Sequence, residues 1–281
     1  MSTENTPAGT SGCASPATVK TVVVKVGTSS ITYPNGNLNF SQIDALTRVL
    51  SDIKNSGLNV VLVTSGAIGV GVSKLSIKQR PEQLKYKQAC AAVGQCELMH
   101  TYDKFFLDYG QKIAQILLTR SDIDNQSRRE NLVNTFSALF EYGCIPVINE
   151  NDSISTDEIE FGDNDSLSAI VACACNADLL FILSDIDGFF TSDPRTDENA
   201  KLIPVITQLS RDVVENAGGA GSARGTGGML TKVHAAQIAA NQQIKTIILN
   251  GNRPQLILNA LKGESVGTLF DLKEDAPIDP D

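Results

Sequence analysis

The stretch "TVVVKVGTSS", residues 21–30, decides the class of fold. It begins with an apolar, β-branched run, residues 21–26, which predicts a strand. Apolar residues occupy both faces of that strand, which indicates a parallel sheet covered by helices on both sides. Lys25 is the exception, because burying an ammonium group is costly unless an anion meets it. Gly27 comes directly after the end of this strand and lets backbone amides approach a ligand closely. We therefore expect a ligand there, and not an edge strand with Lys25 in solvent.

Similar apolar runs recur along the chain, most of them separated by helical patterns. Further strands are predicted at residues 59–64, 112–119, 144–149, 179–184, 245–250 and 266–270. The first long helix is expected to begin at the capping-box-like residues 41–44 and to stop at Gly57, with an apolar face formed by Ile43, Leu46, Leu50 and Ile53. This alternation predicts an α/β protein with a mainly parallel sheet and no internal domain boundary.

Small and polar residues follow four of these strands. They are residues 27–29 (GTS), 65–67 (SGA), 149–152 (NEND) and 184–185 (SD). In open α/β sheets, ligands bind beyond the carboxyl ends of the strands. The four segments are therefore expected to line one site at a common edge of the sheet.

The segment "GGAGSARGTGGMLTK", residues 218–232, has the composition of a phosphate-binding loop. It is not the usual P-loop, which has G-x-x-x-x-G-K-[ST] directly after the first strand, because here Thr231 precedes Lys232 near the end of the chain. A helix is expected to begin near Gly228, so that its N-terminus and the Lys232 ammonium group act on one anion. A plain flexible loop is the alternative, although glycines this dense are costly to order without a ligand.

Three further motifs each have a functional and a plain structural interpretation. "TSGAIGVG" (64–71) has G-x-x-G-x-G spacing, which excludes a dinucleotide fingerprint and leaves either an anion at a helix N-terminus or a tight turn. In "FGDNDSLSAIVA" (161–172), Asp163, Asn164 and Asp165 exceed what one helix cap requires, so one or more can hold a lysine or an ammonium group. "LLFILSDIDGFFTSDPR" (179–195) fits turns as well as the wall of a nucleotide site.

Composition excludes several classes of protein. The 281 residues carry a net charge of −9, which argues against a nucleic-acid partner. No apolar run approaches the ~18 residues of a membrane helix, and residues 1–18 form a polar tail, expected to be disordered, without the apolar core of a signal peptide. Two histidines exclude a His-rich metal site. Reduced, buried thiols and a cytoplasmic protein are expected, because a zinc-site or disulfide pattern is missing from the cysteines, which are Cys13, Cys90, Cys96, Cys144, Cys173 and Cys175.

Six segments in order along the chain resemble the amino acid kinase family; they are VKVGTSS, VTSGAI, PVINENDSIS, FGDNDSLSA, SDIDGFFTSDPR and GTGGMLTK. The resemblance runs from Val22 to Phe270, and the INEND and GDND pair separates this chain from the acetylglutamate, aspartate, carbamate and uridylate kinases of the family. It implies a three-layer αβα sandwich with a mainly parallel sheet of about eight strands. The implied kinase domain covers residues 19–272. Residues 273–281 are expected to be a tail and not the start of the RNA-binding-type PUA domain that many members carry.

The resemblance also implies transfer of the γ-phosphoryl group of ATP to the γ-carboxylate of L-glutamate, the first step of proline synthesis. By family pattern, Lys25 and Lys232 flank the transferring phosphoryl group and Asp165 orients both lysines, so these three are the expected catalytic residues. The expected glutamate-binding residues are Ser65, Asp152, Asn164 and Asp163. The expected ATP-binding residues are Lys25, Ser184, Asp185, Thr226, Gly227, Gly228, Met229, Leu230, Thr231 and Lys232. Mg²⁺ is expected to arrive with ATP, without a metal ligand supplied directly by the protein.

The family pattern further implies inhibition by L-proline through residues 150–163, an acidic loop expected to contain a short hairpin, and assembly into dimers or tetramers. Neither a nucleic acid nor a membrane is an expected partner. Two alternatives stay open. One is a relative that phosphorylates another acceptor, although acetylglutamate kinases carry K-x-G-G where this chain has KVGTS. The other is a non-catalytic sensor of ATP or an amino acid, against which the presence of Lys25, Asp165 and Lys232 argues.

Overall fold

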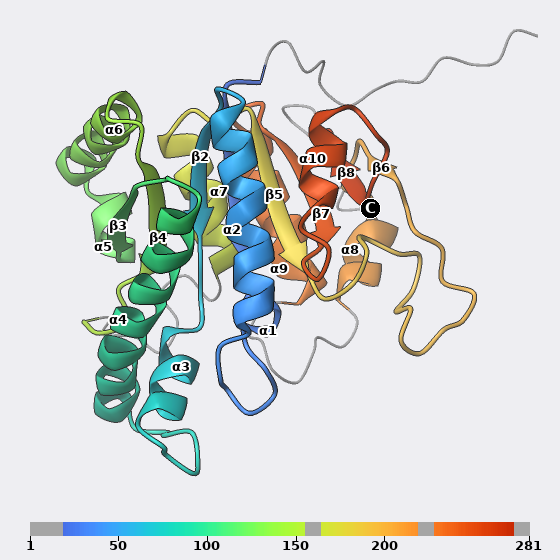
Figure 1. The fold of residues 1–281 in the computed structure, drawn as a ribbon. Helices are drawn as coiled ribbons and strands as arrows, with labels where there is room; N and C mark the ends of the chain where they lie inside the picture. Colours follow the sequence, from blue (N-terminus) through green and yellow to red (C-terminus); the bar gives the residue numbers. More distant parts are fainter. Residues whose placement is uncertain (1–18, 155–163, 219–227, 273–281) are drawn as a thin grey trace, which may run out of the picture.

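The strand predicted at residues 21–26, β1 (Thr21–Val26), lies in the middle of the sheet. The computed structural model describes residues 19–154, 164–218 and 228–272, and these form an eight-stranded sheet in the order β3-β4-β2-β1-β5-β7-β8-β6 (Figure 1). β1 pairs in parallel with β2 on one side and with β5 on the other, so the edge-strand alternative for Lys25 is wrong. The two tails, and residues 155–163 of the expected hairpin, lie outside the described residues.

Strand predictions agree with the structure to within two residues at each end. The remaining strands are β2 (Asn59–Val63), β3 (Ile113–Leu118), β4 (Ile145–Glu150), β5 (Leu179–Ser184), β6 (Val205–Ile206), β7 (Lys245–Asn250) and β8 (Thr268–Phe270). Only the two-residue β6 was not predicted. Among the described strands, β7 and β8 form the one antiparallel pair, which confirms a mainly parallel sheet.

Helices cover both faces of the sheet and form the outer two layers. They are α1 (Thr28–Ile31), α2 (Phe40–Asn55), α3 (Ala67–Lys74), α4 (Leu84–Asp108), α5 (Arg120–Asp124), α6 (Gln126–Glu141), α7 (Asn164–Ala174), α8 (Arg211–Ala217), α9 (Met229–Ala240) and α10 (Leu256–Leu261). One core packs α2, α4 and α10 against the sheet, and Figure 1 shows α2 crossing in front of it. The second core packs α6, α7 and α9 against the opposite face.

The start of α2 differs from the predicted capping box. Asn39 is the N-cap, and its side chain accepts a hydrogen bond from the backbone N–H of Gln42. Asparagine caps as well as serine does, so the N-cap lies two residues earlier than expected. The predicted apolar face is confirmed, since Ile43, Leu46, Leu50 and Ile53 are all buried.

Two glycines allow α3 and α4 to approach each other closely. A Cβ atom on Gly71 would lie 1.8 Å from the carbonyl oxygen of Cys90, and one on Gly94 would lie 1.8 Å from that of Ala67. Neither position can hold any other residue without moving a backbone. The contact fixes α3, which begins directly after the Ser65–Gly66 turn, against the long helix α4.

The prediction of buried thiols is only partly right. Cys90 and Cys175 are buried, Cys144 and Cys173 are half-buried, and Cys96 is exposed on α4. These five cysteines of the described chain are all free thiols. Burial raises the pKa of Cys175 to about 12, which keeps that thiol protonated and unreactive.

Candidate active site

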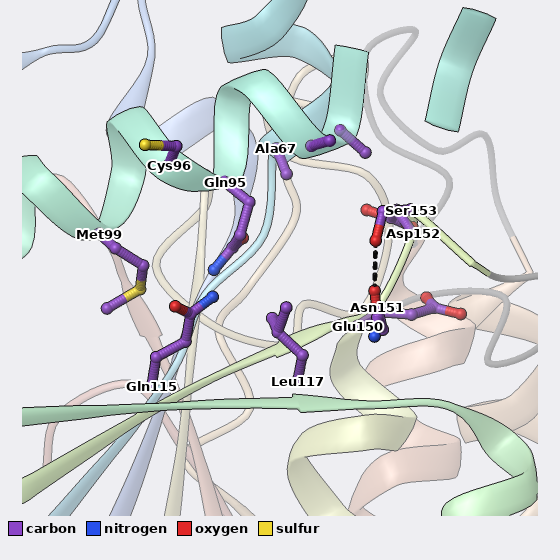
Figure 2. A pocket seen from close by; sticks show the side chains of 12 residues that line it. Ala67, Gln95, Cys96, Met99, Gln115, Leu117, Glu150, Asn151, Asp152 and Ser153 are labelled. Atoms are coloured by element: carbon purple, nitrogen blue, oxygen red, sulfur yellow. Dashed lines mark hydrogen bonds between the residues drawn. The ribbon is translucent and has the colours of Figure 1, made fainter. Parts of the chain in front are cut away.

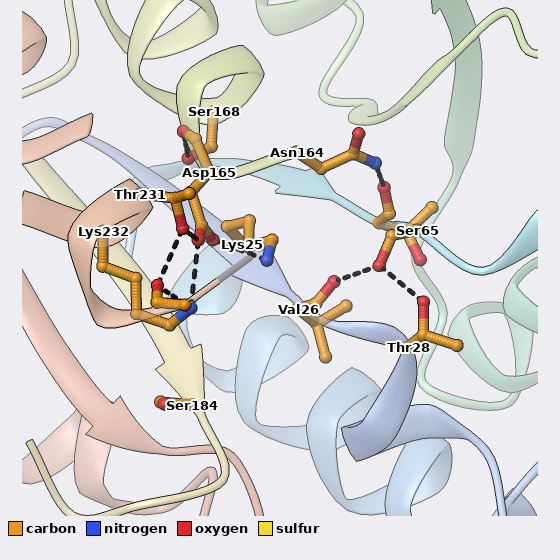
Figure 3. A network of polar contacts seen from close by, with 12 residues as sticks. Lys25, Val26, Thr28, Ser65, Asn164, Asp165, Ser168, Ser184, Thr231 and Lys232 are labelled. Atoms are coloured by element: carbon orange, nitrogen blue, oxygen red, sulfur yellow. Dashed lines mark hydrogen bonds and ion pairs between the residues drawn. The ribbon is translucent and has the colours of Figure 1, made fainter. Parts of the chain in front are cut away.

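Three charged side chains from three separate elements meet beneath the carboxyl end of β1. Lys25 Nζ lies 2.5 Å from Asp165 Oδ1, and Lys232 Nζ lies 3.0 Å from Asp165 Oδ2 (Figure 3). Exposed fractions of the three side chains are 8%, 9% and 0% for Lys25, Lys232 and Asp165. Two ammonium groups against one carboxylate leave a local positive charge in a protein of net charge −9, which suits an anionic ligand.

The alternation of side chains along β1 explains why these groups meet. Val22, Val24 and Val26 point to the face covered by α2 and α4, so Lys25 points with Val23 to the face covered by α7 and α9. Asp165 is the second residue of α7, and Lys232 lies in the first turn of α9. Both helices therefore bring their N-terminal ends, where the helix dipole is positive, to the lysine of the central strand.

The protonation state of Asp165 follows from its neighbours. Burial alone would raise the pKa of this carboxyl group, but the charges and hydrogen bonds of Lys25 and Lys232 hold it well below its ordinary value. Asp165 is therefore ionised at neutral pH. It also accepts a hydrogen bond of 2.9 Å from Thr231 Oγ1, which a prediction limited to charged groups does not reveal.

The N-terminus of α9 leads into this cluster. Gly228 is its N-cap, as expected from the glycine-rich segment, and its carbonyl oxygen accepts from Thr231 Oγ1 at 2.8 Å and from Lys232 Nζ at 3.4 Å. Met229 is half-buried and Leu230 is 47% exposed at the first turn. Thr226 and Gly227, also expected to bind ATP, lie outside the described residues.

Ser65 and Asn164 lie beside β1 on the other side of the lysine cluster. Ser65 Oγ donates to the carbonyl oxygen of Val26 at 3.2 Å, and it lies 3.3 Å from Thr28 Oγ1. Gly66, with a φ of +95°, takes the left-handed conformation that turns the chain into α3. Asn164 Nδ2 donates to the carbonyl oxygen of Thr64, so α7 is joined to the end of β2 (Figure 3).

A cavity of about 400 Å³ lies near the end of β4, and Asp152 forms part of its wall (Figure 2). Burial raises the pKa of Asp152 to about 6, with Arg80 opposing the shift only in part. Above pH 6 the carboxylate can bind a cation such as an ammonium group. Asp163, the other acidic residue expected to bind glutamate, lies outside the described residues.

Ser184 and Asp185 follow β5, the strand next to β1. Ser184 is buried, and its Oγ lies 3.3 Å from Asp185 Oδ1. The Asp185 carboxylate forms an exposed ion pair of 2.6 Å with Arg195. Ser184 also pairs with Asn250 of β7, and its carbonyl oxygen accepts from the backbone N–H of Gly251. Within the described residues, neither side chain forms a hydrogen bond or ion pair with Lys25, Asp165 or Lys232.

Two further residues take part in the polar network, one from the NEND segment expected at this edge of the sheet and one that the sequence did not single out. Asn149 at the end of β4 is 1% exposed and accepts a hydrogen bond of 2.8 Å from Asn164 Nδ2. Gln95 of α4 in turn accepts one of 2.8 Å from Asn149 Nδ2. Asn149 was expected near the site as the first residue of the NEND segment, whereas Gln95 lies within an ordinary helical run and was missed.

Comparisons with known proteins identify the family of this chain. The family model described as "Amino acid kinase family" matches residues 20–250. The chain belongs to the amino acid kinase family. Among curated amino acid kinases, it is 54% identical over 259 residues to a protein named glutamate 5-kinase from Clostridium perfringens, which covers 91% of this chain and 96% of that one. It is also 50% identical over 260 residues to a glutamate 5-kinase from Listeria innocua, covering 91% of this chain and 94% of the relative.

Solved structures support the same kinase fold. An isopentenyl phosphate kinase of T. acidophilum superposes with a TM-score of 0.61 at 16% identity, covering 89% of this chain and all of that one. A UMP kinase from Bacillus anthracis gives a TM-score of 0.61 at 16% identity over 90% of this chain and 96% of the other. At this identity the likeness concerns the fold alone. None of the described helices has the length and apolar character needed to span a membrane.

Proposed function

We propose that this protein is a glutamate 5-kinase, which transfers the γ-phosphoryl group of ATP to the γ-carboxylate of L-glutamate. The observation that carries the proposal is the buried cluster of Lys25, Asp165 and Lys232, which can neutralise a transferring phosphoryl group. Identities of about 50% over nine-tenths of the chain to proteins named glutamate 5-kinase support this choice of acceptor. The product, γ-glutamyl phosphate, begins proline biosynthesis.

The chemistry requires charge neutralisation and positioning more than proton transfer. An oxygen of the glutamate γ-carboxylate attacks the γ-phosphorus of ATP, and the bond to the bridging β–γ oxygen breaks as ADP leaves. The attacking carboxylate is already ionised at neutral pH, so a general base is not required. Charge spreads over the phosphoryl oxygens in the transition state. We assign Lys25 and Lys232 to those oxygens, and Asp165 to holding the two ammonium groups apart and in place.

The proposed substrate positions follow from the sides of the cluster. ATP is assigned to the side formed by Ser184, Asp185 and residues 226–232, with its phosphates over the N-terminus of α9. Glutamate is assigned to the side formed by Ser65, Asp152 and Asn164. We assign the Asp152 carboxylate to the ammonium group of glutamate. Asp152 lines the cavity together with Glu150, and the pKa of Asp152, raised by burial, indicates a carboxylate that a cationic partner would stabilise.

Mg²⁺ is proposed to arrive bound to ATP. The buried carboxylate at the centre, Asp165, already pairs with two ammonium groups and is therefore poorly suited to bind a metal directly. Inhibition by L-proline through the 150–163 loop, assembly into dimers or tetramers, and a cytoplasmic location complete the proposal. The free thiols described above are consistent with a reducing compartment.

Acyl phosphate formation tests the reaction directly. The purified protein would be incubated with Mg-ATP, hydroxylamine and one acceptor at a time, and hydroxamate would be measured together with ADP. We expect hydroxamate with L-glutamate and no turnover with N-acetylglutamate, aspartate or UMP. Turnover with another acceptor alone would contradict the glutamate assignment, and binding of ATP without ADP release would favour the sensor alternative. Millimolar L-proline added to the same assay should reduce the rate.

A further inference from the structure

Three side-chain amides form a hydrogen-bonded chain from α4 to α7. Asn164 Nδ2 donates to Asn149 Oδ1, and Asn149 Nδ2 donates to Gln95 Oε1, both at 2.8 Å. Asn149 and Gln95 are 1% and 9% exposed. These three hydrogen-bonded amides therefore lie inside the protein, between α4, which forms part of the cavity wall, and Asn164, the first residue of α7.

Backbone groups determine which way each of the three side-chain amides is oriented. The backbone N–H of Glu150 donates to Asn149 Oδ1 at 2.9 Å, and the carbonyl oxygen of Thr64 accepts from Asn164 Nδ2. Asn149 must therefore direct its NH₂ group toward Gln95, which has to present an oxygen there. With both hydrogens of its amide in use, Asn164 keeps Oδ1 as an acceptor that receives no hydrogen bond from the described residues.

The other end of Gln95 gives this arrangement its significance. Oε1 accepts from Asn149, so Nε2 is the remaining end of the amide. Gln95 forms part of the cavity wall in Figure 2, and its Nε2 is buried without a partner among the described groups. A buried, unsatisfied donor is unfavourable, because it loses its hydrogen bonds to water without replacing them. Ala67, Ala91 and Met99 line the same cavity, so an apolar side chain such as methionine would pack there without an orphaned donor. The amide of Gln95 is therefore explained by what its oxygen does for Asn149.

We propose that Gln95 is a positioning residue for the amino acid substrate. Its side-chain oxygen fixes the amide of Asn149, and through it the amide of Asn164, in the orientation that leaves Asn164 Oδ1 facing the substrate as an acceptor. This inference rests on the proposed function for the identity of the ligand. We assign Gln95 to act through Asn149 and Asn164, and not by direct contact with the substrate.

The test compares two substitutions of Gln95 in the full chain. Gln95→Met removes the acceptor, so the affinity for L-glutamate, measured by calorimetry without ATP, should fall about tenfold or more, while the KM for ATP stays within about twofold. Gln95→Glu keeps an oxygen at the same distance and should retain affinity better than Gln95→Met. Gln111→Met is the matched control, because it breaks another Gln–Asn amide pair, with Asn55, at the opposite end of β3.

Each result decides the proposal. Glutamate affinity unchanged in Gln95→Met would overturn it. Affinity as weak in Gln95→Glu as in Gln95→Met would also overturn it, because the missing N–H, and not the oxygen, would then matter. A thermal melt of each variant separates loss of fold from loss of affinity, and Gln95→Glu remains informative if Gln95→Met does not fold. Because calorimetry reads binding without turnover, failure of the hydroxamate assay in the wild type would contradict the proposed function and leave this test intact.

Discussion

Lys25 Nζ lies 2.5 Å from Asp165 Oδ1 although the two residues come from a central strand and from a helix on one face of the sheet. Lys232 holds the other oxygen of the same carboxylate. This arrangement means that neither lysine is a free charge in the protein. Each is held at a fixed place by a partner that stays ionised, which is the condition for preorganised electrostatic stabilisation.

Replacing either lysine should impair turnover more than folding. For Lys25→Ala and Lys232→Ala we expect kcat to fall by ~10²–10³, by analogy with the loss of one oxyanion donor. The hydroxamate assay under saturating substrates measures this. Lys74→Ala, which breaks only an exposed pair with Glu97, is the control and should retain full activity. Losses below tenfold in both site variants would refute the assigned role.

Removing the shared carboxylate should affect stability as well. Asp165→Asn leaves two buried ammonium groups without their counter-ion, and breaking a buried ion pair destabilises by about 3–5 kcal/mol. A thermal melt should show a Tm lower by roughly 10 °C. Glu215→Gln breaks the exposed pair with Arg211 and should change Tm very little. Equal Tm values for Asp165→Asn and the wild type would show that the cluster is not under this electrostatic constraint.

The pH dependence of kcat/KM for glutamate should follow the ionisation of Asp152. Its raised pKa means that the carboxylate is protonated below about pH 6 and ionised above it. If the ionised form binds the ammonium group of glutamate, kcat/KM for glutamate should rise about tenfold per pH unit up to about pH 6 and level off by about pH 7.5. Steady-state kinetics at saturating Mg-ATP between pH 5 and 8 measure this. Asp152→Asn should lack the rise, and an unchanged profile in that variant would assign the titration to another group.

The contact between α3 and α4 predicts opposite effects for two glycines of one helix. Gly71→Ala places a methyl group against the backbone carbonyl of Cys90 and should destabilise the protein by about 3 kcal/mol or more. Gly69→Ala meets no atom within 4 Å and should be neutral or stabilising by up to about 1 kcal/mol, since alanine favours a helix. Urea unfolding of both variants measures the difference. Similar stabilities would mean that the helices can separate freely.

Sequence patterns predicted most of the fold because long apolar runs mark buried parallel strands clearly. β6 escaped because it has only two residues, one of them the exposed Val205. The antiparallel direction of β8 was also not predictable, since it depends on how the chain turns after α10, at Gly267 with a φ of +65°. Packing of the sheet, and not local pattern, decides such short elements.

The candidate site was predictable in its residues and not in its contacts. Lys25 and Asp165 were conspicuous because charged groups rarely stand next to buried apolar runs. Their pairing, and the hydrogen bond from Thr231, could not be predicted, because they depend on which face of the strand Lys25 occupies and on how two helices are rotated. Gln95 was invisible because a polar residue in a long helix normally faces solvent, and only the crossing of α4 over the end of β4 places it beside Asn149.

The central position of β1 also governs when the protein can become functional during its own synthesis. Lys20, at the start of β1, hydrogen-bonds through its backbone to Asp178, which lies 158 residues later. Lys232 follows later still, so at typical translation rates Lys25 precedes it by roughly 10–40 s. Until β5 has been synthesised, β1 lacks at least one of its two neighbours in the sheet. A ribosome-bound chain therefore keeps one edge of β1 unpaired until β5 has been made, so the central strand cannot be completed early in synthesis.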